Sequence, residues 1–390
     1  MRSRVTAAGV WDGQSSAANP LIEIEDGRIL SILSGGGGKK SGPMPCGILS
    51  YPGATLAPAF FDVHIHGAAG HDVMEATPEA LHAIGSFLAS HGTASYLATT
   101  VTASVEATLR ALEGLAQMIA RPEQIGNGEP IARPIGIHLE GPFLSHARRG
   151  VQPAEHLLAP DITLFDRFVE AAQGQIRLMT LAPELPGAAA LARHATARGV
   201  RVSVGHSNAT AAETRAVIAA GAVSATHTFN AMRALDHQEP GILGVVLTDD
   251  SLYAELICDG IHSKAEAVNL WWRAKGPLRG ILVTDAMSAA GMPDGEYSLG
   301  GFAVQVAQGR AMARGVLAGS VLTLDRALSN FVEFTGAPVK EALRLVTANP
   351  VAMTGLGGEA GRLAVGGPAN LVAVDARGAL VASIIHGQPV

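Results

Sequence analysis

Residues 55–67 read TLAPAFFDVHIHG, an apolar run that ends in two histidines. The aliphatic and aromatic residues from Thr55 to Ile65 predict a buried β-strand. Beyond this run, short apolar segments alternate with amphipathic segments of helical period, which is typical of repeated βα units and a parallel sheet. The further predicted strands are Ala94–Thr100, Ile135–Leu139, Ile176–Leu181, Val200–Val204, Ser224–His227, Tyr253–Ile257 and Gly280–Thr284. Eight such strands in order predict a (β/α)₈ TIM barrel.

The segments between these strands have helical periodicity. Helices are predicted at Pro78–His91, Ser104–Ile119, Thr163–Ala172, Ala188–Arg198, Ala209–Ala219 and Lys264–Lys275. A glycine-rich stretch, 295–319, follows the eighth strand, and helices at Thr323–Thr335 and Val339–Ala348 are predicted after it. The barrel is therefore expected to occupy residues 57–349.

The two ends of the chain share a strand-and-turn composition. Strand-forming runs are predicted at Arg4–Val10 and at Leu21–Leu33, with turns at Asp12-Gly13 and Asp26-Gly27, and strands at Leu371–Asp375 and Leu380–His386. We expect residues 1–56 and 350–390 to form one small β-sandwich domain. The run Gly35–Gly38 precedes two lysines but lacks the Ser/Thr and the spacing of a P-loop, so we interpret it as the tip of a hairpin.

The composition excludes several classes of protein. Of the 390 residues, 48% are hydrophobic and 16% are charged, which is typical of a globular chain and not of a disordered one. The net charge of −6 argues against a nucleic-acid partner. No apolar run reaches the length of a membrane span, and the first residues do not resemble a signal peptide. We therefore expect a protein that does not bind membranes. Because Cys46 and Cys258 cannot form a disulfide framework, we also expect it to be cytoplasmic.

Polar motifs end five of the predicted strands, and in a barrel those ends meet on the face that carries the active site. His64 and His66 alternate on a strand and so can reach one ion. Glu140 ends the third strand; it is either a metal ligand or a partner of the arginines at 148 and 149. His138 lies two residues earlier and is interpreted as a core residue or a residue behind the ligands.

Two single histidines follow neighbouring strands. His206 and His227, together with Glu140, match the His/His/Glu ligand set of a catalytic zinc site. Asp285 follows the eighth strand and is either a helix N-cap or, beside a metal-activated water, a general acid/base. The strand Ile176–Leu181 contains no lysine that could be carbamylated, so Glu140 would have to bridge if two ions bind.

The motifs also support a resemblance to a known family. The segments are HIHG at 64–67, HLEGPF at 138–143, GHSNAT at 205–210, THTFNAM at 226–232, EPG at 239–241, DGIH at 259–262, TDAM at 284–287 and LAGS at 317–320. In this order they resemble the amidohydrolase superfamily and, within it, the N-acetylglucosamine-6-phosphate deacetylases. The resemblance extends over essentially the whole chain, including the C-terminal GRLAVGGPANLVAVD.

This resemblance implies a metal-dependent hydrolase of amino sugar metabolism. It implies one ion held by Glu140, His206 and His227, with His64 and His66 able to hold a second, and Asp285 as the catalytic acid/base. Zinc is the expected metal, and iron and manganese are alternatives. It further implies a homodimer and a small amino sugar substrate. The substrate pocket would be lined by Val151, Gln152, Asn230, Ala231, Gln238, His262, Leu317, Ala318 and Gly319.

Two positions depart from the family pattern. Gln152 stands where the family usually has a histidine that contacts substrate, and an amide can donate a hydrogen bond but cannot carry a charge. Gln238 stands where the family usually has an arginine that clamps the sugar phosphate. The first hypothesis is therefore deacetylation of N-acetylglucosamine 6-phosphate, and the second is action on a different or unphosphorylated N-acyl amino sugar. A catalytically silent scaffold is the third, although such a protein would be expected to lose its metal ligands.

Overall fold

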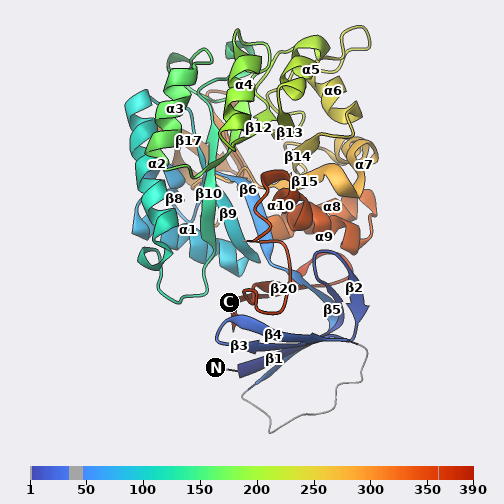
Figure 1. Ribbon diagram of the computed structural model, residues 1–390. Helices are drawn as coiled ribbons and strands as arrows, with labels where there is room; N and C mark the ends of the chain where they lie inside the picture. The colour runs from blue at the N-terminus through green and yellow to red at the C-terminus, as the bar shows by residue number, and fades with distance from the viewer. Residues whose placement is uncertain (1, 35–46, 359) are drawn as a thin grey trace.

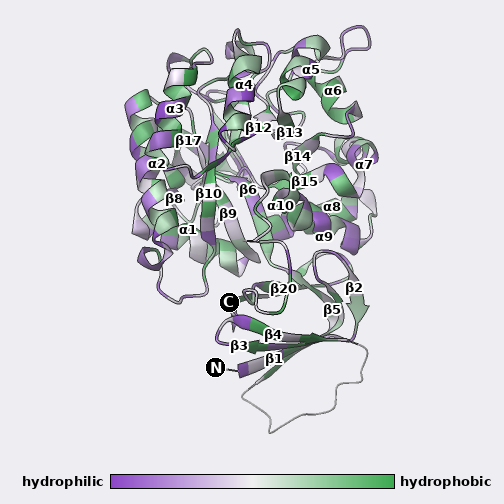
Figure 2. Ribbon diagram, in the orientation of Figure 1, coloured by the Kyte–Doolittle hydropathy of each residue, from purple (hydrophilic) through white to green (hydrophobic). Residues whose placement is uncertain are grey.

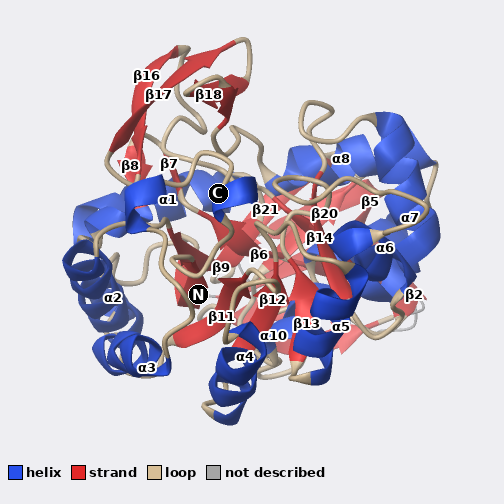
Figure 3. Cartoon of the chain, turned by 90° about the horizontal axis from the view of Figure 1, so that it is seen from above, coloured by secondary structure: helices blue, strands red, loops and turns tan. Residues whose placement is uncertain are grey.

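The computed structural model describes residues 2–34, 47–358 and 360–390. In this part of the chain eight parallel strands form one sheet, in the order β15-β14-β13-β12-β11-β10-β9-β6. Seen from above in Figure 3, the strands are surrounded by helices. The two edge strands meet, because the Asp285 amide donates to the His64 carbonyl at 2.9 Å and Ile65 forms a parallel bridge with Ala286. The predicted α/β barrel is confirmed.

The barrel strands lie close to the predicted segments. They are β6 (Phe60–Ile65), β9 (Thr93–Thr100), β10 (Arg133–Glu140), β11 (Ile176–Leu181), β12 (Arg201–Val204), β13 (Ala222–Ala225), β14 (Tyr253–Ile257) and β15 (Gly280–Val283). The prediction of one continuous strand at 55–65 was wrong. It is divided at Ala59 between β5 (Ile48–Pro58), which belongs to a second sheet, and β6. Pro58 ends β5 opposite Leu371, since a proline cannot donate to the next rung of a ladder.

Most helices also follow the prediction. They are α1 (Pro78–Ser90), α2 (Val105–Ala120), α3 (Ile162–Ala171), α4 (Ala188–Ala197), α5 (Ala211–Ala219), α6 (Gly241–Thr248), α7 (Ala265–Arg279), α8 (Leu324–Thr335), α9 (Val339–Val346) and α10 (Ala348–Thr354). Side-chain caps start several of them; Thr210, for example, caps α5 in a reciprocal box with Glu213. Helices α6 and α10 were not predicted. The α6 residues Gly241–Leu247 are all buried, so this helix has no polar face and no amphipathic period.

Both chain ends contribute to a second sheet, which lies below the barrel in Figure 1. Its strands are β1 (Arg2–Trp11), β2 (Ser16–Ala18), β3 (Leu21–Glu25), β4 (Arg28–Leu33), β5, β20 (Leu371–Val374), β21 (Leu380–Ile385) and β22 (Gln388–Pro389). Val5, Ile22, Leu56 and Leu371 are fully buried in its core. The division into residues 1–56 plus 350–390 and 57–349 stays a prediction, and the hairpin tip at 35–38 lies outside the described residues.

A smaller antiparallel sheet follows the eighth barrel strand and projects to one side in Figure 3. It contains β16 (Gly295–Leu299), β17 (Phe302–Ala307), β18 (Arg310–Ala313) and β19 (Val316–Leu317), and it lies near the short pair β7 (Gly67–Ala68) and β8 (His71–Asp72). Its apolar side packs on Val101, Val151 and Met287, which belong to loops at the barrel mouth. The glycine-rich stretch therefore forms part of the wall beside those loops.

Hydrophobic residues run along β10, whereas the outer helices mix hydrophobic and hydrophilic positions (Figure 2). This is the distribution expected when helices cover a buried parallel sheet. Among the described residues, no helix combines the length and the apolar character that crossing a membrane requires.

One aromatic cluster joins α7 to α8, and it supplies a test of core stability. The fully buried Phe331 ring lies edge-on to Trp272 at 5.2 Å and to Trp271 at 6.3 Å between centroids. Phe331→Ala is expected to lower the free energy of unfolding by about 3–5 kcal/mol, because it leaves a cavity between two helices. Urea denaturation measures this loss. Phe302→Ala, at a partly exposed position, should cost less; an equal cost for the two variants would contradict the packing argument.

Candidate active site

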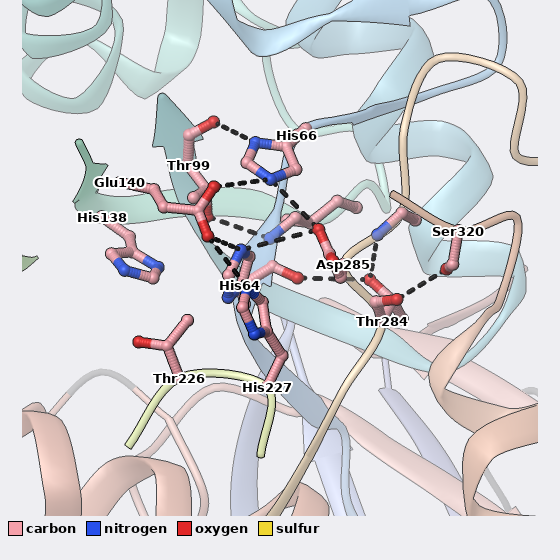
Figure 4. A network of polar contacts seen from close by, with 12 residues as sticks. His64, His66, Thr99, His138, Glu140, Thr226, His227, Thr284, Asp285 and Ser320 are labelled. Carbon is pink, nitrogen blue, oxygen red and sulfur yellow. Dashed lines mark hydrogen bonds and ion pairs between the residues drawn. The ribbon is translucent and has the colours of Figure 1, made fainter. Parts of the chain in front are cut away.

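A buried cluster of imidazoles and carboxylates lies at the carboxyl ends of the barrel strands. Its members each come from the end of a strand or from the first loop residues after it: His64 and His66 (β6), Glu140 (β10), His206 (β12), His227 (β13) and Asp285 (β15). Figure 4 shows His64, His66, Glu140 and Asp285 turned toward one another. The structure thus brings together all six residues that the sequence singled out as metal ligands or acid/base.

The first group is formed by Glu140, His206 and His227. Glu140 Oε1 lies 3.2 Å from His206 Nε2 and 3.2 Å from His227 Nε2, and the two Nε2 atoms lie 3.0 Å apart. Three donor atoms that converge on one point from three strands of the barrel have the composition of a catalytic zinc site with one open position.

The second group is formed by His64, His66 and Asp285. Asp285 Oδ1 lies 3.1 Å from His66 Nε2 and 3.6 Å from His64 Nε2. Glu140 faces this group too, because its Oε1 is 3.4 Å from His64 Nε2 and its Oε2 is 3.4 Å from His66 Nε2. A carboxylate between two groups of donors is placed to bridge two cations.

Backbone carbonyls orient two of the rings. His66 Nδ1 lies 3.0 Å from the Thr99 carbonyl oxygen, and His206 Nδ1 lies 3.2 Å from the Arg148 carbonyl oxygen. Since a carbonyl only accepts, each Nδ1 must carry a proton, and in the neutral ring each Nε2 is left with a lone pair directed into the cluster. This is the tautomer that a metal ligand requires, so the donor set fits a divalent cation.

The charges within the cluster reinforce one another. Burial raises the pKa of the Asp285 carboxyl, but the imidazoles of His64 and His66 lower it further, to about 2. Burial likewise opposes ionisation of Glu140, yet His64 and His206 hold its pKa well below the usual range. Among the protein groups themselves, burial lowers the pKa of the His66 imidazole. The carboxylates of Asp285 and Glu140 have the stronger, opposite effect and raise this pKa to about 9. Both carboxylates are therefore ionised at neutral pH and attract positive charge.

The backbone at the ligands is left-handed at several non-glycine positions. His206 has φ 45°, His227 has φ 29° and Asp285 has φ 50°. Such conformations are uncommon for residues other than glycine and persist only where the surrounding structure enforces them. They turn the chain sharply at the strand ends, which is how residues after the strands reach the common centre.

Gln152 lies against the cluster in a way that the sequence did not suggest. Its Nε2 donates to Glu140 Oε2 at 2.7 Å, and its Oε1 accepts from the Thr102 amide at 2.9 Å. The buried side chain thus spans from the Thr102 backbone amide to the Glu140 carboxylate. Its predicted contact with substrate stays a prediction, whereas its contact with Glu140 is a feature of the structure.

Gln152→Ala is expected to weaken the affinity of the cluster for a divalent cation about 10–100-fold, as loss of a partner behind a metal ligand typically does. Titration of the metal-stripped protein with zinc measures the change. Gln305→Ala, which removes an exposed amide on β17, is the matched control and should leave the affinity unchanged. Equal affinities for the two variants would contradict a supporting role for Gln152.

Other predicted substrate residues surround the same mouth. The Asn230 side chain donates weakly to the His227 and Thr228 carbonyls at 3.3 and 3.4 Å. The Ala231 carbonyl accepts from the Ser207 amide at 3.0 Å. These bonds hold the loop after β13 beside the first group of donors.

The remaining predicted positions differ in burial. His262 Nδ1 lies 2.7 Å from Asp259 Oδ2, so its ring has an internal partner. Gln238 is exposed on the loop before α6. Val151 is buried under the β16–β19 sheet. Residues 317–319 pass beside Asp285: the Ala318 amide donates to Ala311, Gly319 has φ 63°, and the next amide, of Ser320, donates to the Asp285 carbonyl at 2.7 Å.

Two buried residues behind the ligands complete the arrangement. His138 Nε2 lies 2.8 Å from Thr180 Oγ1 and its Nδ1 lies 3.2 Å from the Val63 carbonyl, so it is a satisfied core residue as interpreted. Burial lowers its pKa well below the usual range.

Glu255 was not predicted from the sequence as a residue of the site. It is fully buried on β14, and its Oε2 lies 3.1 Å from His64 Nδ1. The signal was a lone glutamate inside the apolar run YAELI, where an unpaired carboxylate would be costly.

Comparison with known proteins agrees with this geometry. Residues 55–389 match the amidohydrolase family model. An Escherichia coli protein named N-acetylgalactosamine-6-phosphate deacetylase is 40% identical over 355 residues, covering 91% of this chain and 90% of that protein. The N-acetylglucosamine-6-phosphate deacetylase of Bacillus subtilis is 36% identical over 372 residues, covering 95% and 92%. A solved Mycobacterium smegmatis N-acetyl-D-glucosamine-6-phosphate deacetylase mutant, in complex with N-acetyl-D-glucosamine-6-phosphate, has a TM-score of 0.89 at 34% identity, covering 100% of this chain and 99% of that chain.

Proposed function

Because the chain belongs to the amidohydrolase family and, within it, to the N-acetylglucosamine-6-phosphate deacetylase family, we propose that it hydrolyses N-acetylglucosamine 6-phosphate. The products are glucosamine 6-phosphate and acetate. The observation that carries the proposal is the convergence of four imidazole nitrogens and two ionised carboxylates at the barrel mouth, with every donor buried.

The donor set supports a divalent cation on Glu140, His206 and His227, and a second on His64, His66 and Asp285. Imidazole and carboxylate ligands suit zinc, which is the metal we propose, with iron and manganese as alternatives. A cation bound there would lower the pKa of a water molecule and polarise the amide carbonyl of the substrate.

The chain's own residues supply the proton transfers. Asp285 is ionised and buried beside the cluster, so it can take the proton of the attacking water through its carboxylate. The same carboxyl group then gives that proton to the sugar nitrogen as the C–N bond breaks and acetate leaves. We propose that Asn230, Ala231, His262 and residues 317–319 line the sugar site.

The identity of the sugar has a second candidate. A relative that is 40% identical bears the name of a galactosamine enzyme, and Gln152 differs from the histidine that the family pattern usually has. N-acetylgalactosamine 6-phosphate is therefore the alternative substrate. Gln238 in place of the expected arginine favours a weaker hold on the phosphate and keeps the unphosphorylated sugars as a further alternative.

A panel of four substrates tests these choices. It pairs N-acetylglucosamine 6-phosphate with its 4-epimer, each with and without the phosphate, and compares kcat/KM by release of acetate. The proposal expects the phosphorylated glucosamine derivative to have the highest kcat/KM. A higher kcat/KM for the galactosamine derivative would make N-acetylgalactosamine 6-phosphate the proposed substrate. A higher kcat/KM for an unphosphorylated sugar would contradict the proposal that the substrate carries a phosphate. Either result would be consistent with deacetylase chemistry.

A silent scaffold is the remaining alternative. The retention of all five candidate ligands and of Asp285 argues against it. A purified protein that binds none of zinc, iron and manganese would support the silent scaffold instead. We further propose that the protein acts in the cytoplasm as a homodimer, and size-exclusion chromatography with light scattering tests the dimer.

A further inference from the structure

Glu255 is a buried carboxylate that touches the cluster without facing its centre. It lies on β14 with a fully buried side chain. Its Oε2 is 3.1 Å from His64 Nδ1 and accepts from the His227 backbone amide at 3.3 Å. One oxygen therefore contacts a residue from each of the two groups of donors.

The counter-charge for this carboxylate does not come from an ordinary ion pair. Within the described ranges of the chain, no lysine or arginine lies within ion-pair distance of Glu255, and its Oε1 has no hydrogen-bond partner. An isolated buried carboxylate is expensive, so such groups are paired or neutralised through a metal centre. The one imidazole that Glu255 contacts, His64, directs its other nitrogen toward Asp285.

His64 differs in this respect from the other candidate ligands. The Nδ1 atoms of His66 and His206 face neutral carbonyl oxygens, whereas that of His64 faces a carboxylate. A carboxylate behind a histidine fixes the ring orientation and makes the opposite nitrogen a stronger ligand. Among the described residues, a carboxylate behind a ligand histidine is found in the group of His64, His66 and Asp285 and not in the group of Glu140, His206 and His227.

Charge balance points the same way. Glu140 and Asp285 offset only half of the charge of two divalent cations, and Glu140 is shared between the two groups, whereas Asp285 lies in the second. Glu255 offsets part of the remainder while it leaves the open coordination positions free. We propose that Glu255 is a positioning residue that allows His64, His66 and Asp285 to hold a second cation; this inference rests on the metal-dependent function proposed above.

The test measures cation binding without substrate. Metal-stripped protein is dialysed against cobalt at rising concentrations, and bound cobalt per chain is determined by elemental analysis. The unchanged protein should bind two ions, and Glu255→Gln should bind one normally and the second about 10–100-fold more weakly. Two ions at unchanged affinity in Glu255→Gln, or a single ion in the unchanged protein, would overturn the proposal.

Two variants separate this role from a merely structural one. Asp325→Asn removes a partly buried carboxylate outside the cluster that also pairs with a histidine Nδ1, that of His91 at 3.2 Å, and should bind two ions. Glu255→Asp keeps the charge on a shorter side chain and should retain more affinity for the second ion than Glu255→Gln; the reverse order would contradict the electrostatic argument. Because no sugar is present, a failure of the deacetylase assay leaves this result unaffected, so the two proposals fail separately.

Discussion

Asp285→Asn is expected to fold normally, to keep a cation on Glu140, His206 and His227, and to lose turnover of N-acetylglucosamine 6-phosphate on the order of 10²–10⁴-fold, the usual contribution of a general acid/base. The amide has almost the same shape as the carboxylate but cannot take up the proton of the attacking water. The low pKa of Asp285, about 2, means that the group removed is the ionised base at neutral pH.

The measurement is kcat at saturating substrate, together with metal content and thermal unfolding. Asp325→Asn, which alters a partly buried aspartate paired with His91 outside the cluster, controls for the loss of a paired carboxylate and should keep most of the activity. If Asp285→Asn turned over substrate at a rate near that of the unchanged chain, Asp285 would have no part in proton transfer.

The barrel could be predicted because each strand is a short apolar run and each helix has an amphipathic period. The ligands could be predicted for the same reason, since a polar residue is conspicuous where an apolar strand stops, as at Glu140 and His206. Two of the elements that were misjudged lack that contrast. Helix α6 is apolar on every side, and the run from Thr55 to Ile65 remains apolar while the chain passes from one sheet to another.

The contacts behind the ligands could not be predicted, because they join residues far apart in the sequence. Gln152 reaches Thr102 and Glu140, and Glu255 reaches His64 across 191 positions. Neither pairing follows from local periodicity. The first depends on how the loop after β10 folds back over the strand ends, and the second on the closure of the barrel. The left-handed backbone at His227 and Asp285 also has no local signal, since glycine, the residue that normally marks such a turn, is absent there.

Glu140→Gln is expected to have the largest effect of any substitution in the cluster, because the Glu140 carboxylate lies within 3.4 Å of Nε2 atoms of both groups of donors. The variant should bind neither cation firmly. Loss of the Lewis acid removes several kcal/mol of transition-state stabilisation, equivalent to about 10³–10⁴-fold in rate, and loss of the activated water lowers the rate further. Deacetylation should therefore fall below detection.

Elemental analysis beside the acetate assay distinguishes this outcome from a loss of chemistry alone. Glu140→Gln should lose metal and activity together, whereas Asp285→Asn should lose activity and keep a cation on the first group. The Gln152→Ala variant retains Glu140 but frees its Oε2, so its metal affinity should lie between that of Glu140→Gln and that of the unchanged chain. A Glu140→Gln protein that retained two ions at full affinity would show that the imidazoles alone hold the metals and that the carboxylate does not bridge them.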